Sequence, residues 1–339
     1  MKGLITRIQR FSTTNGPGLR STVFMKGCPL RCLWCHNPET QKMKRELLFY
    51  EAQCVKCGTC VRICPQGVHQ LVNRTSEITE AENGKTEAEA ADPAGTDVIH
   101  VLERSECALC GACVEHCPVD ALEIAGMEID AEEVVQRLLR DRAFYKNSGG
   151  GITLSGGEPL LQLDFTVEIL RRCKEEGLHT CLDTSGYTVG TFHHTEDNGS
   201  SCDGREVMTR LVRDRLADLF LFDLKETDEE RHQAATGVPL SPILENLNAI
   251  GDAGGSIRLR CPIIPGINDR AAHMERIAGI AGKVPGIMAI DLIPYHRLGL
   301  VKAEALGEEQ QEFASLTEEK KQELLGILSD NTKLRCNWI

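Results

Sequence analysis

The segment Gly151-Ile-Thr-Leu-Ser-Gly-Gly-Glu158 joins a short apolar run to a glycine-rich polar turn, and this combination recurs along the chain. The apolar and β-branched run at 151–154 predicts a buried strand. The polar turn follows at once, so it would lie at the carboxyl end of that strand. In folds that alternate parallel strands with helices, such ends meet on one face.

From about residue 126, apolar runs of strand length alternate with segments of helical periodicity. The alternation predicts a parallel sheet, either an open doubly wound sheet or a full or partial barrel. Asp164 is expected to be the N-cap of the second helix. The expected strands are 21–25, 151–154, 180–182, 219–222, 257–259 and 287–290. The expected helices are 130–146, 164–176, 205–217, 241–252, 270–283 and 316–330.

Each of the six expected strands is followed by residues able to do chemistry. Any one group could be an ordinary cap or turn. Six of them at the same topological end favour a barrel, whose active site lies where the loops after the strands converge. The groups are Cys28, Cys32 and Cys35; Ser155 to Glu158; Asp183 to Gly186; Asp223, Leu224 and Lys225; Arg260 with 262–266; and 294–296, which ends in His296.

The composition is that of a globular protein with a core. The chain has 339 residues, of which 41% are hydrophobic and 26% charged, and this length corresponds to about two domains. With 38 basic and 50 acidic residues the formal charge is −12, which argues against nucleic acid or a membrane surface as the main partner. Because apolar runs of spanning length and a signal peptide are missing from the sequence, we expect a cytoplasmic protein.

The chain has 16 cysteines, and 11 of them fall between Cys28 and Cys117. Cytosolic thiols stay reduced, so dense clustering indicates metal rather than disulfides. Eight belong to two copies of one motif, spaced as in bacterial ferredoxins, where three thiolates of one copy and the last of the other bind each [4Fe–4S] cluster. The copies are Cys54-Val-Lys-Cys57-Gly-Thr-Cys60-Val-Arg-Ile-Cys64-Pro65 and Cys107-Ala-Leu-Cys110-Gly-Ala-Cys113-Val-Glu-His-Cys117-Pro118.

On this pattern one cluster uses Cys54, Cys57, Cys60 and Cys117, and the other uses Cys107, Cys110, Cys113 and Cys64. A pair of zinc sites is the alternative, and two complete copies with both prolines disfavour it. Glycines 58 and 111 suit tight wrapping around a cluster. The acidic segment 73–97 has few large apolar residues and is expected to be a solvated loop.

The other three clustered thiols lie in Gly27-Cys-Pro-Leu-Arg-Cys-Leu-Trp-Cys-His36. Three thiolates can hold three irons of a cubane and leave the fourth iron open to an outside ligand. With His36 as a fourth ligand the three thiols would form a closed, structural zinc site. This alternative is disfavoured because a structural zinc ion would not need the carboxylates, the lysine and the glycine-rich loop that are expected beside it. The five unclustered cysteines are expected to be inert: Cys173, Cys181, Cys202, Cys261 and Cys336.

Several motifs together resemble the glycyl radical enzyme activating enzymes of the radical S-adenosylmethionine (SAM) superfamily. The cysteine spacing resembles the cluster motif of the superfamily, and 156–159 resembles its glycine-rich motif. The resemblance runs from about residue 5 to 300, and the ferredoxin motifs are similar to those of the larger family members. The matching strings are 9–11, 15–20, 26–32, 34–39, 149–158, 182–186, 223–225, 262–266 and 294–296.

The resemblance implies a partial (β/α)6 TIM-like radical SAM barrel formed by residues 1–50 and 126–339, with an α+β ferredoxin-like domain inserted at 51–125. It implies three [4Fe–4S] clusters and SAM, whose cleavage yields a 5′-deoxyadenosyl radical that takes a hydrogen atom from a glycine of a partner enzyme. The partner is a glycyl radical enzyme, met at its C-terminal glycine loop. Flavodoxin or ferredoxin would donate the electron, and the chain alone would be monomeric.

The resemblance also implies roles for individual residues at the SAM site. Cys28, Cys32 and Cys35 would bind the catalytic cluster. Lys225 and His296 suit the methionine carboxylate, while Gly156, Gly157 and Glu158 lie near the ammonium. Asp183 and Asp223 would meet the ammonium or share a monovalent cation. Leu224, between Asp223 and Lys225, would also belong to the cofactor site. Trp34 and His36 would line the adenine side.

Three further polar residues are weaker candidates for partner or ribose contact: Arg260, Arg20 and Asn15. Asn15 stands where the family commonly carries aspartate. Two rival functions remain at this point: a radical SAM enzyme acting on a small molecule, and an iron–sulfur electron carrier. The glycyl radical enzymes considered as the partner act on isethionate, choline, hydroxyproline, glycerol or hydroxyphenylacetate. The ferredoxin-like insert argues against pyruvate formate-lyase as the partner.

Overall fold

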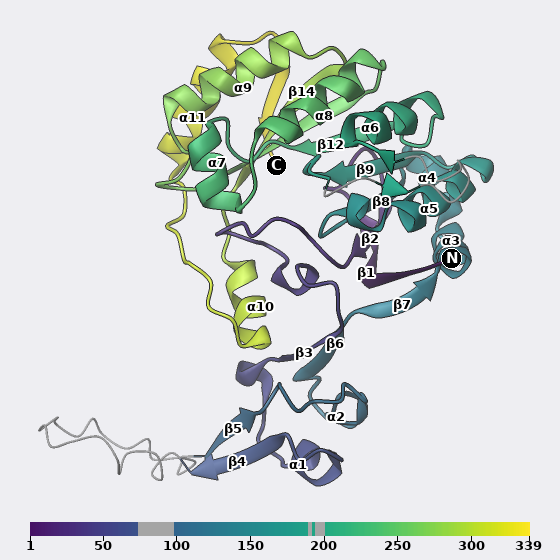
Figure 1. Ribbon diagram of the computed structural model, residues 1–339. Coiled ribbons are helices and arrows are strands. Elements are labelled where there is room, and N and C mark those ends of the chain that lie inside the picture. The colour runs from purple at the N-terminus through teal and green to yellow at the C-terminus, as the bar shows by residue number, and fades with distance from the viewer. Residues whose placement is uncertain (74–97, 189–191, 194–200) are drawn as a thin grey trace, which may run out of the picture.

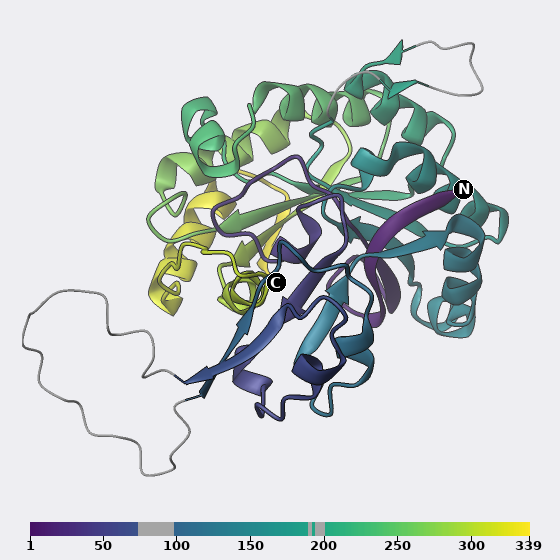
Figure 2. The ribbon, with the colours of Figure 1, turned by 60° about the horizontal axis from the view of Figure 1, so that its bottom comes forward.

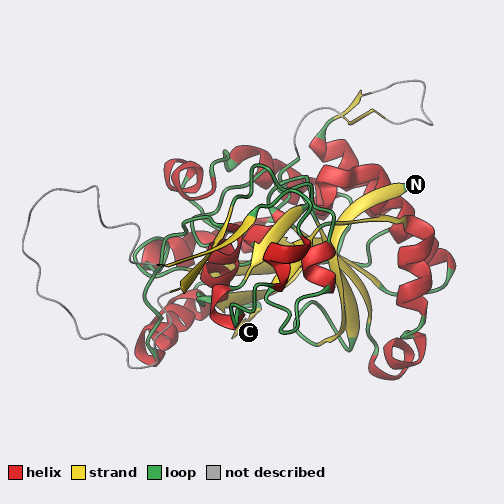
Figure 3. Ribbon diagram, turned by 90° about the horizontal axis from the view of Figure 1, so that it is seen from below, coloured by secondary structure: helices red, strands yellow, loops and turns green. Residues whose placement is uncertain are grey.

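The computed structural model describes residues 1–73, 98–188, 192–193 and 201–339. A nine-stranded sheet forms its centre, in the order β15-β14-β13-β12-β9-β8-β2-β1-β7. The sheet curves, and helices cover its outer side (Figures 1 and 3). A smaller part with its own short strands lies beside one end of the sheet (Figure 2).

The six expected strands are all present, adjacent and parallel, so the predicted barrel-type sheet is confirmed. Their registers align the carboxyl ends; Met25 pairs with Gly156, and Asp223 pairs with Arg260. The strands are β2 (Arg20–Met25), β8 (Gly151–Gly156), β9 (Thr180–Thr184), β12 (Leu219–Asp223), β13 (Ile257–Ile263) and β14 (Ile287–Pro294).

Three strands extend this sheet beyond the six that the sequence predicts. Antiparallel β1 (Lys2–Ser12) and β7 (Met127–Asp130) continue it past β2, and parallel β15 (Arg335–Trp338) continues it past β14. Strand β1 alternates in burial only weakly, and β7 and β15 have four residues each. Such short or mostly polar segments give little periodic signal.

The helices follow the expected ranges with four differences. The range 130–146 divides into two helices at Asp141, whose carboxylate accepts hydrogen bonds from Arg10 and from Ser21 Oγ. The prediction of Asp164 as an N-cap is wrong, because Gln162 occupies that position and Asp164 lies in the first turn. Helices α7 and α10 were not expected. The bounds are α3 (Ala131–Leu139), α4 (Arg142–Ser148), α5 (Leu163–Glu175), α6 (Gly204–Arg213), α7 (Glu229–Thr236), α8 (Ser241–Asp252), α9 (Ala271–Lys283), α10 (Leu298–Leu306) and α11 (Glu318–Asp330).

The main core fills the space between the sheet and these helices. Phe220, Phe222 and Leu259 are fully buried, as are Ile169 of α5 and Leu247 of α8. Burial of large apolar side chains supplies the main favourable term for the fold. This core makes the sheet a rigid support for the loops at its carboxyl edge.

The ferredoxin motifs occupy the smaller part, which has two strand pairs and two short helices. Gly58 and Gly111 each precede a helix in the left-handed conformation, with φ of 71° and 85°, which glycine adopts most easily. The expected loop at 73–97 lies outside the described residues from position 74 onward. The elements are β3 (Glu46–Phe49), α1 (Thr59–Ile63), β4 (His69–Asn73), β5 (Val98–Leu102), α2 (Ala112–Glu115) and β6 (Leu122–Ala125).

Helix α10 lies between the smaller part and the large sheet (Figure 1). Its residues Ala305 and Leu306 pack against Leu48 and Ala125 of the β3–β6 pair. Lys302 donates to the Glu39 carboxylate at 2.8 Å and to Asn37 Oδ1 at 2.7 Å, in the segment after β2. This helix therefore ties the two parts together. Among the described residues, the structure contains no helix long and apolar enough to span a membrane.

Candidate active site and iron–sulfur sites

The loop after β2 carries the thiols of Cys28, Cys32 and Cys35, all partly buried. Arg31 and Leu33 anchor the loop by donating their backbone N–H groups to the end of α7. Burial raises the pKa of Cys32 to about 12, although the nearby ammonium of Lys225 opposes this rise. Thiolates in so dry a place require positive charge beside them, which iron ions would supply.

The glycine-rich turn after β8 packs directly on this cysteine loop. Gly157 donates its N–H to Met25 O at 3.0 Å, and Glu158 donates its N–H to Gly27 O at 2.8 Å. A Cβ on Gly157 would lie 2.1 Å from Gly27 O, and one on Gly156 would lie 2.3 Å from Met25 N. Glycine is therefore required here by the joining of two loops, independently of any ligand.

The Glu158 side chain, buried at 1% exposure, serves the neighbouring turn after β9. Its Oε1 accepts from Leu160 N at 3.2 Å and Thr184 Oγ1 at 2.7 Å. Its Oε2 accepts from Ser185 N at 2.9 Å and Ser185 Oγ at 2.7 Å. A carboxylate has about four acceptor sites, so all are in use. Glu158 thus positions backbone and leaves no acceptor for a ligand ammonium.

A row of alternating charges crosses the carboxyl edge of the sheet. Asp183 Oδ2 accepts from Ser155 Oγ at 2.6 Å and from Arg260 at 3.1 Å. Arg260 Nε also lies 3.9 Å from Asp223 Oδ1, and Lys225 Nζ donates to Asp223 Oδ2 at 2.8 Å. Burial raises the pKa of Asp183, and the positive charge of Arg260 opposes that rise. The guanidinium of Arg260, treated above only as a weaker candidate, bridges the two expected carboxylates.

The loop after β12 is held from beneath by a buried ion pair. Glu226 is fully buried and accepts two hydrogen bonds from Arg270, at 2.7 and 2.8 Å. Asn268 Nδ2 donates to Lys225 O at 2.8 Å. Leu224, between the two charged residues, is fully buried in the core and donates its N–H to Arg260 O. These contacts fix where Lys225 can reach.

The two residues expected on the adenine side, Trp34 and His36, differ in exposure, and His296, expected at the methionine carboxylate, lies beside His36. The rings of His36 and His296 are edge to face, with centroids 3.9 Å apart, and both residues are exposed. Trp34 is 7% exposed and packs in a cluster with Ile264 and Tyr295. Most of its ring is therefore used by the core.

Two of the weaker candidates lie away from this edge, at the opposite ends of the strands. Arg20 is fully buried at the start of β2 and donates to Thr153 Oγ1 at 2.8 Å and to backbone carbonyls. The suggestion that Arg20 contacts a partner or ribose is wrong for this reason. Asn15 donates to Thr22 Oγ1 at 3.1 Å.

The ferredoxin-type thiols gather around two cavities, each walled by the set of four that the motif predicts. One cavity is lined by Cys107, Cys110, Cys113 and Cys64. The other is lined by Cys54, Cys57, Cys60 and Cys117. Four thiols around one hollow are the donor set of a [4Fe–4S] cluster. The residues present therefore fit the two clusters.

Sequence reasoning missed a pair of buried histidines between these cavities, His69 and His100. Burial lowers the pKa of His69 to about 4 and also lowers the pKa of His100. Superposing the two motif copies would have revealed them, because each histidine stands where the other copy has leucine.

The unclustered cysteines lie apart from these sites. Cys173, Cys181 and Cys261 are buried in hydrophobic clusters, and Cys336 is partly buried. Burial raises the pKa of Cys173 to about 12, which keeps the thiol protonated. The side chain of Cys202 lies outside the described residues.

Three family models match the chain. That of the radical SAM superfamily matches residues 112–277, that of a 4Fe–4S dicluster domain matches 53–122, and that of a 4Fe–4S single cluster domain matches 14–67. The first match covers β8, β9, β12 and β13, the second covers both ferredoxin motifs, and the third covers the cysteine loop.

Curated relatives are similar over most of the chain. The benzylsuccinate synthase activating enzyme of Thauera aromatica is 37% identical over 90% of this chain and 82% of its own. The trans-4-hydroxy-L-proline dehydratase activating enzyme of Clostridioides difficile is 34% identical over 98% and 99%. The choline trimethylamine-lyase activating enzyme of Oleidesulfovibrio alaskensis is 34% identical over 90% and 87%.

Proposed function

The chain belongs to the glycyl radical enzyme activating enzymes of the radical SAM superfamily, and we propose that it generates the glycyl radical of a partner enzyme. The observation that carries this proposal is the contact between the cysteine loop and the glycine-rich turn, beside a charged row at the same edge. SAM bound at a reduced [4Fe–4S] cluster supplies the 5′-deoxyadenosyl radical that abstracts a hydrogen atom from glycine.

The residues around the cysteine loop suit a ligand that carries both an ammonium and a carboxylate. Lys225 would bind the carboxylate by a charge-assisted hydrogen bond, with His296 at the rim. Asp183 and Asp223 would face the ammonium or a monovalent cation, with Arg260 holding both carboxylates in place. The backbone of Gly156 and Gly157 leaves room beside Cys28, Cys32 and Cys35, which would hold the iron. Trp34 and His36 would line the adenine side.

The ferredoxin-like insert, residues 51–125, would hold the other two clusters on the two sets of four thiols. We infer that electrons reach the chain from flavodoxin or ferredoxin and that the partner presents its C-terminal glycine loop at the barrel face. The chain would act as a monomer in the cytoplasm. The partner would be a small-molecule lyase, dehydratase, decarboxylase or similar enzyme, because the relatives activate enzymes of such kinds.

Anaerobic reconstitution tests the proposal. The protein should bind about 12 irons, four for each of three clusters, and should convert SAM to 5′-deoxyadenosine when reduced. Cys32→Ala should lose about four irons and the nucleoside product, whereas Cys336→Ala, a matched change outside the three sites, should lose neither.

Mixing with candidate glycyl radical enzymes should give the glycyl radical doublet by electron paramagnetic resonance (EPR). Deoxyadenosine without a radical on any such enzyme, together with turnover of a free metabolite, would favour the small-molecule alternative. Full iron content without any SAM cleavage would exclude both radical SAM functions and leave the iron–sulfur electron carrier as the remaining alternative.

A further inference from the structure

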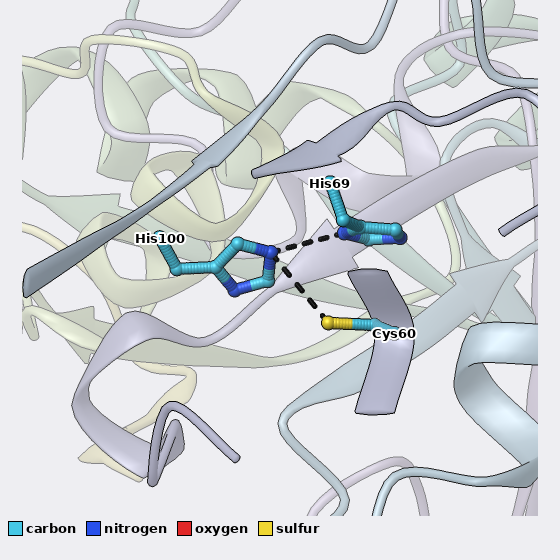
Figure 4. Close-up of side chains that lie close together, drawn as sticks. All are labelled: Cys60, His69 and His100. Carbon is cyan, nitrogen blue, oxygen red and sulfur yellow. Dashed lines mark hydrogen bonds between the residues drawn. The ribbon is translucent and has the colours of Figure 1, made fainter. Parts of the chain in front are cut away.

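A pair of histidine rings, His69 and His100, lies beside Cys60 (Figure 4). His69 lines the cavity of Cys64 and Cys107, and His100 lines the cavity of Cys54 and Cys60. His69 Nδ1 and His100 Nε2 lie 3.0 Å apart, at hydrogen-bonding distance. The residues are 2% and 7% exposed, respectively. The pair therefore forms a buried polar connection between two metal sites.

The pair breaks the internal symmetry of the ferredoxin-like part. The two motif copies are 53 residues apart, so His100 corresponds to Leu47, and His69 corresponds to Leu122. Leu47 and Leu122 belong to the hydrophobic cluster of the β3–β6 pair. The β4–β5 pair carries histidines at the equivalent places. A buried polar pair in place of leucines is costly unless its hydrogen bonds are made.

Only one of the two cavities receives the hydrogen bonds of this pair. His100 Nδ1 lies 3.7 Å from Cys54 Sγ, and His100 Nε2 lies 3.7 Å from Cys60 Sγ. The backbone N–H of Lys56 also reaches Cys54 Sγ, at 3.4 Å, and that of Ala121 reaches Cys117 Sγ, at 3.3 Å. In the part of the chain that the structure describes, neither histidine lies at hydrogen-bonding distance from the sulfurs of the other cavity, which belong to Cys64, Cys107, Cys110 and Cys113.

The donors and acceptors of the pair allow two arrangements of protons, and both place an N–H of His100 against the same set of four thiols. A cluster-bound thiolate only accepts hydrogen bonds, so a neutral His100 donates to Cys54 through Nδ1–H or to Cys60 through Nε2–H. In the first arrangement the bare Nε2 of His100 accepts from His69 Nδ1–H across the 3.0 Å contact, and in the second Nε2–H also faces a bare His69 Nδ1. His69 Nε2 is buried without a hydrogen-bond partner among the described residues.

We propose that His100 donates an N–H···S hydrogen bond to the cluster held by Cys54, Cys57, Cys60 and Cys117, that His69 holds the His100 ring in place through their 3.0 Å contact, and that this cluster therefore has the higher reduction potential of the ferredoxin-type pair. The inference rests on the cluster content given under the proposed function. A hydrogen bond to sulfur stabilises the added electron of the reduced cluster, which raises the potential. His100 and His69 are positioning residues that act on the cluster through its ligands.

The test is an EPR-monitored redox titration of the reconstituted holoenzyme. The SAM-binding cluster is identified by the change in its signal when SAM is added, which leaves two ferredoxin-type steps. His100→Leu introduces the side chain of the other copy, and it should lower the higher potential while the lower one stays. His69→Leu should lower the same potential by a smaller amount. His116→Leu, an exposed histidine beside Cys117, should move neither.

His100→Asn keeps a side-chain N–H and should recover part of the shift. Unchanged potentials in His100→Leu with full iron content would overturn the proposal, as would a shift of the lower step only. Loss of one cluster from both His100 variants would also overturn the proposal, because the His100 ring would then be needed for binding of the cluster and not for its reduction potential. One bound zinc in place of four irons would show a metal site of Cys60, His69 and His100 instead. None of these readouts requires SAM cleavage, so they remain separate from a failure of the proposed function.

Discussion

Replacing Glu158 with glutamine tests whether this buried carboxylate acts by positioning the turn after β9. The carboxylate accepts two backbone N–H groups, from Leu160 on one oxygen and from Ser185 on the other. An amide of the same shape has one oxygen, so its NH2 group must face one of these donors. Thr184 and Ser185 can rotate their hydroxyls to accept instead, whereas a backbone N–H cannot.

One buried N–H without an acceptor costs about 1–3 kcal/mol, so we expect the free energy of unfolding to fall by about 2 kcal/mol. Urea denaturation of anaerobic protein measures this change, with Glu128→Gln on the exposed face of β7 as the control. Hydrogen exchange of the peptide that contains Ser185 should accelerate in Glu158→Gln alone. The weakened turn should also lower SAM affinity, by about tenfold for each 1.4 kcal/mol of lost positioning. A stability within 0.5 kcal/mol of the wild type, with unchanged exchange, would refute the assigned role.

Three other changes test the contacts around the same edge. Gly157→Ala should destabilise the protein by about 1–3 kcal/mol because its Cβ would meet Gly27 O at 2.1 Å. Gly279→Ala, in an exposed part of α9, should stabilise it by about 0.5–1 kcal/mol. Thermal denaturation compares the two variants, and stability changes of the same sign would contradict the packing argument. Arg270→Ala should cost about 3–5 kcal/mol by leaving the Glu226 charge buried and unpaired, and adding Glu226→Gln should restore more than half in a double-mutant cycle. Lys225→Met should weaken SAM binding at least tenfold with iron content unchanged, as calorimetry and iron analysis can show; undiminished affinity would remove Lys225 from the site.

The sequence predicted the parts of the fold that have strong local patterns. All six parallel strands contain apolar or β-branched residues that are mostly buried, and such runs are visible without knowledge of their neighbours. Helix α7 was missed because its buried residues are His232, Ala235 and Thr236, which form no apolar stripe. Helix α10 was missed although it is apolar, because its buried face is divided between the cysteine loop and the β3–β6 pair.

The residues of the candidate site also fall into those that local sequence patterns predict and those that only the folded structure brings together. The cluster-binding thiols and the turn glycines can be predicted from their spacing in the sequence, because a cluster or a tight turn constrains positions that are close along the chain. The groups that hold the loops in place come from other strands: Arg260 of β13 reaches Asp183 of β9, and Glu158 after β8 holds Ser185 after β9. Partners so far apart in sequence share no motif. Only the folded sheet shows that Glu158 and Arg260 are engaged by the protein itself.

The charges of the described edge determine what it can take in. Asp183 and Asp223 are matched by Arg260 and Lys225, so this row is neutral before any ligand arrives. A ligand with one sign of charge would leave part of the row unpaired in a partly buried place, which is costly. A zwitterion can exchange partners with the row without changing its net charge. The cysteine loop beside it is different, because three thiolates there would carry negative charge that Lys225 alone cannot balance. The charged row therefore favours binding of a zwitterionic amino acid group, and the thiols favour binding of a cationic metal centre. One ligand arrangement satisfies both preferences when the amino acid group lies beside the metal.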